Sequence, residues 1–399
     1  MRIRHLSTRY LNRTEVALAA VILALLPATL LTSPRPAKKH AKTSPASAAH
    51  SAQEAPRIHP LSLEAMRARV LDARPLALYY TVGSTIGLDS LLAHASEMTV
   101  LAPQCYWLDQ HGEVHGNVPP PVMEAARRAG LPVLALLYNR DFSRPVASVL
   151  LHNRKLQRRV IRNLAVIASR EDLLGFQLDL ENIDPNDMHL YSRFVHDVAV
   201  ALHRDGRLLS VAVVPRFLDS RPNQWSAAYD YPALARSADF LTLMAYDNSG
   251  RNGPPGPIAG YDWVKNALEY ARTRVPPDKL LLGIALYGRE WSESQRGIQA
   301  RTLAYPETRA LLDRLSLTPR WDEKQRSPWF EYRTGGTVRS VWYENARSVQ
   351  EKLMLVERFR LRGFAAWRLG MEDPQIWPLV YTLRKSRPSS PAGRGAAGY

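Results

Sequence analysis

The 399-residue sequence is poor in the residues that build disulfides, metal centres and phosphate-binding loops. Its single cysteine, Cys105, cannot form an internal disulfide and has no CxxC partner. The eleven histidines show no HxH or HExxH spacing, and no glycine-rich loop has the spacing that cradles phosphate. We therefore expect no metal ion and no cofactor. The missing motifs also argue against an enzyme that acts on nucleic acid.

Acidic residues are scarce at the two ends of the chain. Residues 1–57 contain nine Lys/Arg and two acidic residues, and residues 384–399 contain four Lys/Arg and no acidic residue. The net charge of +16 therefore lies mostly in these two segments, and only +5 remains for residues 58–383. This distribution favours solvated basic arms beside an anionic membrane or wall polymer over a surface that recognises nucleic acid.

Long uncharged apolar runs are also rare, and residues 16–32 form the one that stands out. Four arginines precede it: Arg2, Arg4, Arg9 and Arg13. Its length lies between the apolar core of a signal peptide and a full membrane span, and no clear small-x-small cleavage site follows it. We predict that residues 1–34 are a signal-anchor or signal peptide. The protein would then be exported to the periplasm or cell surface and anchored in the inner (cytoplasmic) membrane by this segment.

The remaining tails and the central region have different compositions. Residues 35–57 are rich in Ala, Pro, Ser and Lys, which is typical of a flexible linker, and residues 384–399 have the composition of a disordered basic tail. Residues 58–383 alternate apolar runs of strand length with amphipathic stretches of helical length. The candidate strands are residues 76–81, 98–107, 132–138, 174–180, 208–214, 240–246, 280–287 and 363–369.

Strands that are apolar throughout and are separated by helices indicate a parallel sheet that is covered on both faces. Eight such units predict an α/β fold of the (β/α)8 TIM-barrel type for residues 58–383. The stretch at about residues 289–341 interrupts the alternation. Its Gly335-Gly336 pair, between two runs of aromatic and β-branched residues, predicts a hairpin within a small α+β insertion between strand seven and its helix.

The most informative stretch is LLGFQLDLENI, residues 173–183, in the fourth predicted strand. Its alternation points Gln177, Asp179 and Glu181 to one side, and burying polar groups there is costly unless they have a function. Two close carboxyl groups cannot both ionise cheaply, so one is driven towards its protonated form and can act as a general acid. At the carboxyl end of a barrel strand, such a pair indicates glycosidic bond cleavage. By itself, the DxE pattern leaves an ion-pair network or a metal site as alternatives.

Further motifs, in their order and spacing, resemble the family 18 glycoside hydrolases over about residues 75–380. The matching segments are LGFQLDLE, for the family's strand-four pattern DGxDxDxE; LMAYD, for its strand-six MxYD; LLLGIALYGREW, for strand seven; VWYENARSVQEKL, for the end of its inserted subdomain; and GFAAWRLGMED, for strand eight with its floor tryptophan. The resemblance implies a TIM-barrel glycosidase. It also implies a substrate-assisted retaining mechanism, in which the 2-acetamido oxygen of an N-acetylated sugar is the nucleophile.

The resemblance also implies roles for individual residues. Glu181 would be the acid and then the base, Asp179 would orient the acetamido group, and Tyr246 would hydrogen-bond its carbonyl oxygen. Trp367 would stack under the sugar at the cleavage point. The residues implied to line neighbouring subsites are Met244, Asp247 and Arg289.

Two positions depart from the family pattern, because Leu174 and Gln177 replace its first and middle aspartates. An amide at position 177 resembles the bacterial branch that is directed at peptidoglycan or spore cortex, and we include Gln177 among the substrate-binding residues. The sequence thus predicts hydrolysis of β-1,4 bonds in N-acetylglucosamine-containing glycans, with peptidoglycan or a related bacterial polysaccharide favoured over chitin. The alternatives are a lectin-like barrel that binds glycan without cleaving it, and a transglycosylase.

Overall fold

The computed structural model describes residues 61–219, 224–294 and 297–385. The leader predicted at residues 1–34, the linker predicted at residues 35–57 and nearly all of the basic tail lie outside these residues. Within the described ranges, no helix combines the length and the apolar character that crossing a membrane requires.

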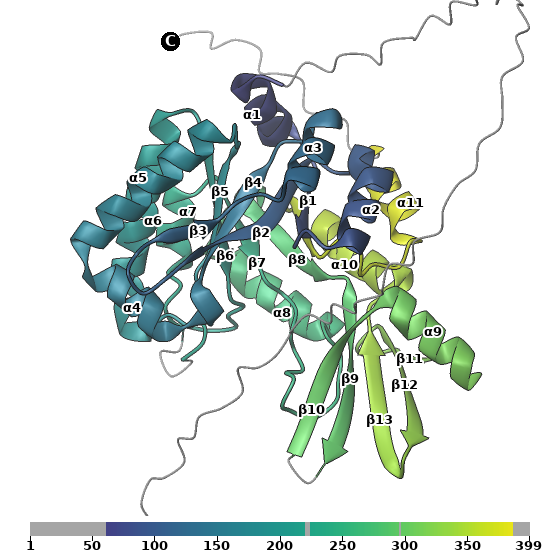
Figure 1. Cartoon of the computed structure of the whole chain (residues 1–399). Helices are drawn as coiled ribbons and strands as arrows, with labels where there is room; N and C mark the ends of the chain where they lie inside the picture. Colours follow the sequence, from purple (N-terminus) through teal and green to yellow (C-terminus); the bar gives the residue numbers. More distant parts are fainter. Residues whose placement is uncertain (1–60, 220–223, 295–296, 386–399) are drawn as a thin grey trace, which may run out of the picture. The chain divides into compact units, whose positions relative to one another are not determined.

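Eight parallel strands form a closed barrel, which confirms the predicted fold (Figure 1). They are β1 (Leu76–Thr81), β2 (Val100–Leu108), β4 (Leu134–Asn139), β5 (Gly175–Asp179), β6 (Leu208–Val213), β7 (Phe240–Leu243), β8 (Leu280–Ala285) and β14 (Gly363–Trp367). The hydrogen-bonded order is β1-β14-β8-β7-β6-β5-β4-β2, and a parallel pairing of β1 with β2 closes the ring. Each strand coincides with one predicted apolar run, because strands that are buried on both faces carry few polar residues.

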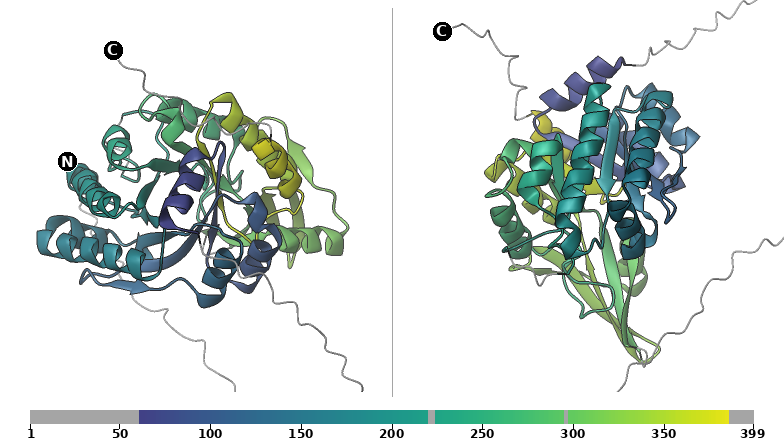
Figure 2. Two further views of the ribbon diagram at one scale, coloured as in Figure 1. Left: turned by 90° about the horizontal axis from the view of Figure 1, so that it is seen from above. Right: turned by 90° about the vertical axis from the view of Figure 1, so that its left-hand side faces the viewer.

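Helices cover the outside of this ring, as Figures 1 and 2 show. The helices of the barrel are α1 (Leu63–Asp72), α2 (Thr85–His94), α3 (Pro120–Arg128), α4 (Arg144–His152), α5 (Arg154–Arg170), α6 (Met188–Arg204), α7 (Tyr231–Ser237), α8 (Tyr261–Ala271), α10 (Ala346–Arg358) and α11 (Ile376–Lys385). Short 3-10 turns join them: η1 (Ala95–Glu97), η2 (Arg140–Phe142), η3 (Pro185–Asp187) and η4 (Pro277–Lys279). A short strand, β3 (Val114–Gly116), pairs antiparallel with β2.

Helix α6 shows how the sequence starts and orients such a helix. Asp184 precedes the turn η3, and its carboxylate accepts a hydrogen bond from the backbone N–H of Asn186 (2.9 Å). Pro185 occupies the first position of the turn, where its missing N–H costs nothing. The predicted apolar stripe of α6 is buried: Tyr191, Phe194, Val195, Val198 and Leu202. The segment that follows β5 is therefore fixed at both its capped start and its packed helix.

The apolar residues of β5 and of its flanks belong to two clusters. Phe176, Leu178 and Leu180 belong to the large cluster that includes the buried faces of the helices. Leu174 belongs to the second cluster, which fills the barrel interior with residues from the other strands. Met66 and Val70 of α1 also pack in this second cluster. The two polar side chains of β5, Gln177 and Asp179, are buried on the side of the strand opposite to Phe176 and Leu178.

The inserted region is a five-stranded antiparallel sheet with one helix, which confirms the predicted α+β insertion. Its elements are β9 (Tyr287–Ser294), β10 (Gly297–Ala304), α9 (Tyr305–Leu315), β11 (Arg320–Asp322), β12 (Ser327–Thr334) and β13 (Thr337–Tyr343). Gly335 and Gly336 form the predicted turn between β12 and β13, with φ of +56° and +78°. Leu311 and Leu312 of α9 pack against one face of this sheet. The insertion therefore has a small apolar core of its own.

Candidate active site

Strand β5 carries the two predicted catalytic carboxyl groups to the mouth of the barrel. Gly175 begins the strand with φ of +156°, and a Cβ atom there would lie 1.9 Å from the carbonyl oxygen of Leu208 on β6. Only glycine allows this approach of the two strands. Asp179 is the last residue of β5, and Glu181 lies just beyond it, after Leu180. Both lie at the carboxyl end of the strand, where (β/α)8 barrels carry their active sites.

Hydrogen bonds hold the backbone around Glu181 from the end of β4 and from the loop that follows β6. Fully buried Asn139 accepts from the Glu181 N–H through Oδ1 (2.9 Å) and donates from Nδ2 to the Glu181 carbonyl oxygen (3.0 Å). The Tyr229 hydroxyl donates to the carbonyl oxygen of Leu180 (2.9 Å). Asn182, the next residue, has a left-handed φ of +55°. This bracing fixes where the Glu181 side chain leaves the backbone.

Burial dominates the electrostatics of the two carboxyl groups. Asp179 is 4% exposed, and its Oδ1 has no hydrogen-bond partner among the described residues. Burial raises its pKa. Burial also raises the pKa of Glu181, and the nearby carboxylates of Asp179 and Asp247 raise it further. Glu181 therefore keeps its proton at a higher pH than an ordinary glutamic acid, which is the state that a general acid requires.

Glu181 lines a cleft of about 270 Å³ at the mouth of the barrel. Three residues that follow β7, Met244, Tyr246 and Asp247, line the same cleft, so the structure brings together four of the predicted site residues. The rest of the lining is apolar or aromatic: Val214, Pro215, Phe217, Trp225 and Trp263. Burial is the largest cause that raises the pKa of the Tyr246 hydroxyl, which is therefore a neutral hydrogen-bond donor.

Arg289 lies behind Asp247 and does not line the cleft. It is 3% exposed, and its guanidinium donates to Asp247 Oδ1 (2.6 Å) and to the carbonyl oxygen of Ser249 (2.7 Å). The Tyr287 hydroxyl donates to the same Asp247 oxygen. These contacts make Arg289 a support for Asp247, whose half-exposed carboxylate reaches the cleft.

Gln177 and Trp367 also lie outside the lining of the cleft. Gln177 is fully buried, and its Nε2 donates to Ser210 Oγ (3.2 Å) and to Thr242 Oγ1 (3.0 Å) on the two following strands. Its amide thus belongs to the barrel interior beneath the site, and the predicted substrate contact does not fit this position. Trp367 ends β14, half-buried, with its ring centroid 5.2 Å from that of Tyr80.

The sequence motifs did not identify Asn139 or the aromatic wall formed by Phe217, Trp225 and Trp263. Phe217 and Trp263 pack at 5.5 Å between ring centroids, and Trp225 is 49% exposed. Phe217 and Trp225 lie in the segment between β6 and α7, and Trp263 lies in the first turn of α8, which follows β7. Phe217, close after the end of the predicted strand 208–214, was the available signal, whereas Trp225 and Trp263 lie farther along the chain.

The described residues include no group of three or more His, Cys, Asp or Glu side chains arranged to hold a metal ion. Cys105 is half-buried, and burial raises the pKa of its thiol. The cleft itself offers carboxyl, hydroxyl and aromatic groups. Such a set suits acid–base chemistry on a sugar that stacks against aromatic rings.

Known proteins share this sequence pattern. Residues 138–372 match the family model "Glycosyl hydrolases family 18". The chain is 27% identical over 314 residues to the glycosylase YvbX of Bacillus subtilis, covering 77% of this chain and 91% of that protein. It is 31% identical over 259 residues to the cortical fragment-lytic enzyme of Bacillus cereus, covering 63% of this chain and 60% of that enzyme.

Solved structures share the fold. The chitinase of Chromobacterium violaceum superimposes with a TM-score of 0.73 at 30% identity, over 78% of this chain and 100% of that one. The spore cortex-lytic enzyme SleL of Bacillus megaterium superimposes with a TM-score of 0.71 at 27% identity, over 77% of this chain and 72% of that one. With a family match over more than half of its length, this chain belongs to the glycosyl hydrolases of family 18 and is a glycosidase.

Proposed function

We propose that this glycosidase hydrolyses β-1,4 bonds in N-acetylglucosamine-containing glycans by a substrate-assisted retaining mechanism, with peptidoglycan or a related bacterial polysaccharide favoured over chitin. The observation that carries the proposal is Glu181. It is a carboxyl group with a raised pKa that lines an aromatic cleft and is braced through its own backbone. The leading apolar segment supports export, so we further propose that the enzyme works in the periplasm or at the cell surface, tethered through residues 1–34.

In the proposed first step, the Glu181 carboxyl group gives its proton to the glycosidic oxygen as the bond to C1 breaks. A retaining enzyme also needs a nucleophile on the opposite face of the sugar. The other carboxylate in the cleft, Asp247, is engaged by Arg289 and Tyr287, and Asp179 is buried behind the cleft. The acetamido oxygen of the substrate therefore supplies the nucleophile and forms a cyclic oxazolinium ion.

In the second step, water attacks C1 while the Glu181 carboxylate accepts its proton, and the acetamido group is released. The acetamido group needs support while it carries positive charge. Asp179 contributes a nearby negative charge, and the neutral Tyr246 hydroxyl donates a hydrogen bond to the acetamido oxygen. A sugar without the N-acetyl group offers no nucleophile and is not a substrate.

The choice of glycan rests on two observations. The curated relatives include cortical fragment-lytic enzymes, although the chain spans only about 60% of their length. In addition, Gln177 stands where the chitinase pattern has an aspartate, and its amide bonds Ser210 and Thr242 without adding a charge beside Asp179. Both favour peptidoglycan over chitin as the substrate of this branch.

The test is the release of reducing ends by wild type and Glu181→Gln from peptidoglycan, chitin oligosaccharides and deacetylated chitosan. We expect turnover of the N-acetylated substrates by wild type only, with peptidoglycan preferred, and no turnover of chitosan. Proton NMR of the first product should show the β-anomer. Equal activity of the two proteins, cleavage of chitosan, or tight binding of N-acetylglucosamine oligomers without turnover would contradict the proposal.

A further inference from the structure

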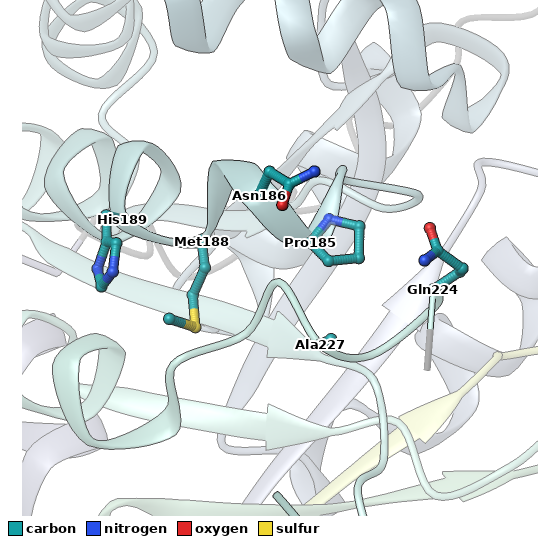
Figure 3. A pocket seen from close by; sticks show the side chains of 6 residues that line it. All are labelled: Pro185, Asn186, Met188, His189, Gln224 and Ala227. Atoms are coloured by element: carbon teal, nitrogen blue, oxygen red, sulfur yellow. The ribbon is translucent and has the colours of Figure 1, made fainter. Parts of the chain in front are cut away.

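A second cavity, of about 210 Å³, is lined by residues that follow β5 and β6, and Figure 3 shows the side chains that line it. One wall is the start of the loop and helix that follow β5, and the other is part of the loop that follows β6. The lining residues are Pro185, Asn186, Met188, His189, Gln224 and Ala227. The cavity is smaller than the roughly 300–1,000 Å³ of pockets for drug-sized ligands, so it suits a short substituent and not a further stretch of sugar chain.

Uncommitted amide groups characterise this cavity. Within the described part of the chain, no hydrogen bond occupies the side-chain amides of Asn186 and Gln224. The backbone N–H of Asn186 is already taken by Asp184, so the helix start offers the cavity no free donor there. A carboxamide both donates and accepts, which complements a peptide group.

The remaining lining limits the ligand further. Its lining residues within the described part of the chain include no Asp, Glu, Lys or Arg, and His189 is the titratable side chain among them. Pro185, Met188 and Ala227 add apolar surface that suits small aliphatic side chains. The free carboxamides and the apolar side chains together fit a short peptide segment.

The cavity and the catalytic cleft share a wall. Gln224 and Ala227 line the cavity, whereas Trp225, between them in sequence, lines the cleft. On the opposite side, Pro185 follows Glu181 by only a few residues. The cavity and the cleft therefore lie against the same two segments of the chain, the one that follows β5 and the one that follows β6.

We propose that this cavity binds the first residues of a peptide stem carried by the glycan in the cleft, which makes the enzyme selective for peptide-substituted strands. This inference rests on the proposed function, because only a peptidoglycan-type strand carries such a substituent. Asn186 and Gln224 hydrogen-bond the peptide groups of the stem, and Met188 and Ala227 contact the aliphatic side chains of the stem.

The experiment compares two substrates made from one preparation, glycan strands with intact peptide stems and the same strands after an amidase has removed the stems. The full chain is assayed as wild type, Asn186→Ala and Gln224→Ala, with Gln299→Ala as the control for loss of an exposed amide on β10. We expect each cavity variant to lower kcat/KM about fivefold on stem-bearing strands, the loss of one hydrogen bond, and to leave stripped strands unaffected. The control should change neither value.

A binding measurement provides a readout without turnover. In the Glu181→Gln background, stem-bearing fragments should bind more tightly than stripped fragments, and adding Gln224→Ala should reduce the difference about fivefold. An unchanged preference for stems in the cavity variants, or equal losses on both substrates, would overturn the inference while leaving hydrolysis intact. Failure of wild type to cleave either strand would overturn the proposed function, and this inference with it.

Discussion

Two glutamates with raised pKa values, half-buried Glu181 and fully buried Glu344, lie in different regions of the molecule and have opposite kinds of neighbours. Glu181 lies at the mouth of the barrel, and Glu344 lies where the inserted sheet returns to helix α10. Burial raises the pKa of both. At Glu181 the carboxylates of Asp179 and Asp247 add to this effect, whereas at Glu344 the ammonium group of Lys352, 2.9 Å away, opposes it.

The comparison teaches that burial alone does not make a catalytic acid. Glu344 and Lys352 are 1% and 2% exposed in their side chains, and they tie the end of the insertion to α10 as an ion pair. Glu181 has acidic neighbours instead of a cationic partner, so holding its proton relieves repulsion. At Glu344 burial beside a cation gives a structural ion pair, whereas at Glu181 burial beside acidic groups favours the protonated carboxyl group.

Replacing Glu181 by Gln should have the largest effect on activity. The amide keeps the shape of the side chain but cannot transfer a proton, so kcat on N-acetylated glycan should fall by about 10³-fold. In thermal unfolding the variant should be as stable as wild type or more stable. The folded state disfavours the charged form of Glu181, and the neutral amide removes that cost. Glu293→Gln, an exposed glutamate on β9, is the matched control and should keep full activity. A loss of less than tenfold in Glu181→Gln would exclude it as the acid.

Breaking the ion pair at the junction should have the largest effect on stability. Lys352→Met leaves Glu344 buried without its cation, and the free energy of unfolding should fall by about 3–5 kcal/mol, measured with urea. Adding Glu344→Gln should recover most of the loss. Arg309→Met breaks an exposed pair with Asp313 and should change stability by less than about 1 kcal/mol. If the single and double variants were equally unstable, the ion pair would not be the cause.

Removing the brace on the Glu181 backbone should have an intermediate effect. Asn139→Ala deletes both hydrogen bonds to Glu181, so the acid loses its fixed position and kcat should fall by about 10- to 100-fold. KM should change little, since Asn139 does not line the cleft. Asn163→Ala, on α5, controls for the loss of an asparagine. A rise in KM with unchanged kcat would show that Asn139 acts on substrate binding instead.

The smallest expected effect is the pH dependence of stability. The pKa of Asp179 is raised in the folded state, so the folded protein binds this proton more tightly than the unfolded chain does. The proton therefore stabilises the fold fully below the unfolded pKa, which is about 4. This stabilisation is lost as the pH rises through the folded pKa. Asp179→Asn removes this dependence. From pH 4 to 8, wild type should lose roughly 1–2 kcal/mol relative to the variant. Urea titrations at each pH measure the difference, and a relative gain by wild type would contradict the raised pKa.

The fold and the acid pair could be predicted because they depend on local pattern. Apolar runs indicate strands that are buried on both faces, and the alternation along residues 176–181 indicates which side chains lie on the same side of the strand. The turn at Gly335-Gly336 was equally visible, since positive φ at consecutive residues favours glycine. None of these inferences required knowledge of contacts between distant segments.

Other assignments depended on such contacts. Arg289 belongs to a matching motif, but packing turned its guanidinium to Asp247 and Ser249 and away from the cleft. Gln177 shares a side with the acid pair, yet it lies deeper, where Ser210 and Thr242 take its amide. A residue's depth in the barrel and the partner of a long side chain are set by neighbouring strands, which the local sequence does not encode.

The sequence by itself determined the succession of strands and of their motifs along the chain, the inserted hairpin, and the positions of Asp179 and Glu181. These features depend on periodicity and turn chemistry, which act over a few residues. Only the tertiary structure decided that Asn139 braces Glu181 from the preceding barrel strand and that Trp225 lines the cleft while its neighbours Gln224 and Ala227 line a second cavity. The physical reason is that these contacts join loops from different strands. Closure of the barrel brings those loops to one mouth, and the distance between them along the chain carries no sign of it.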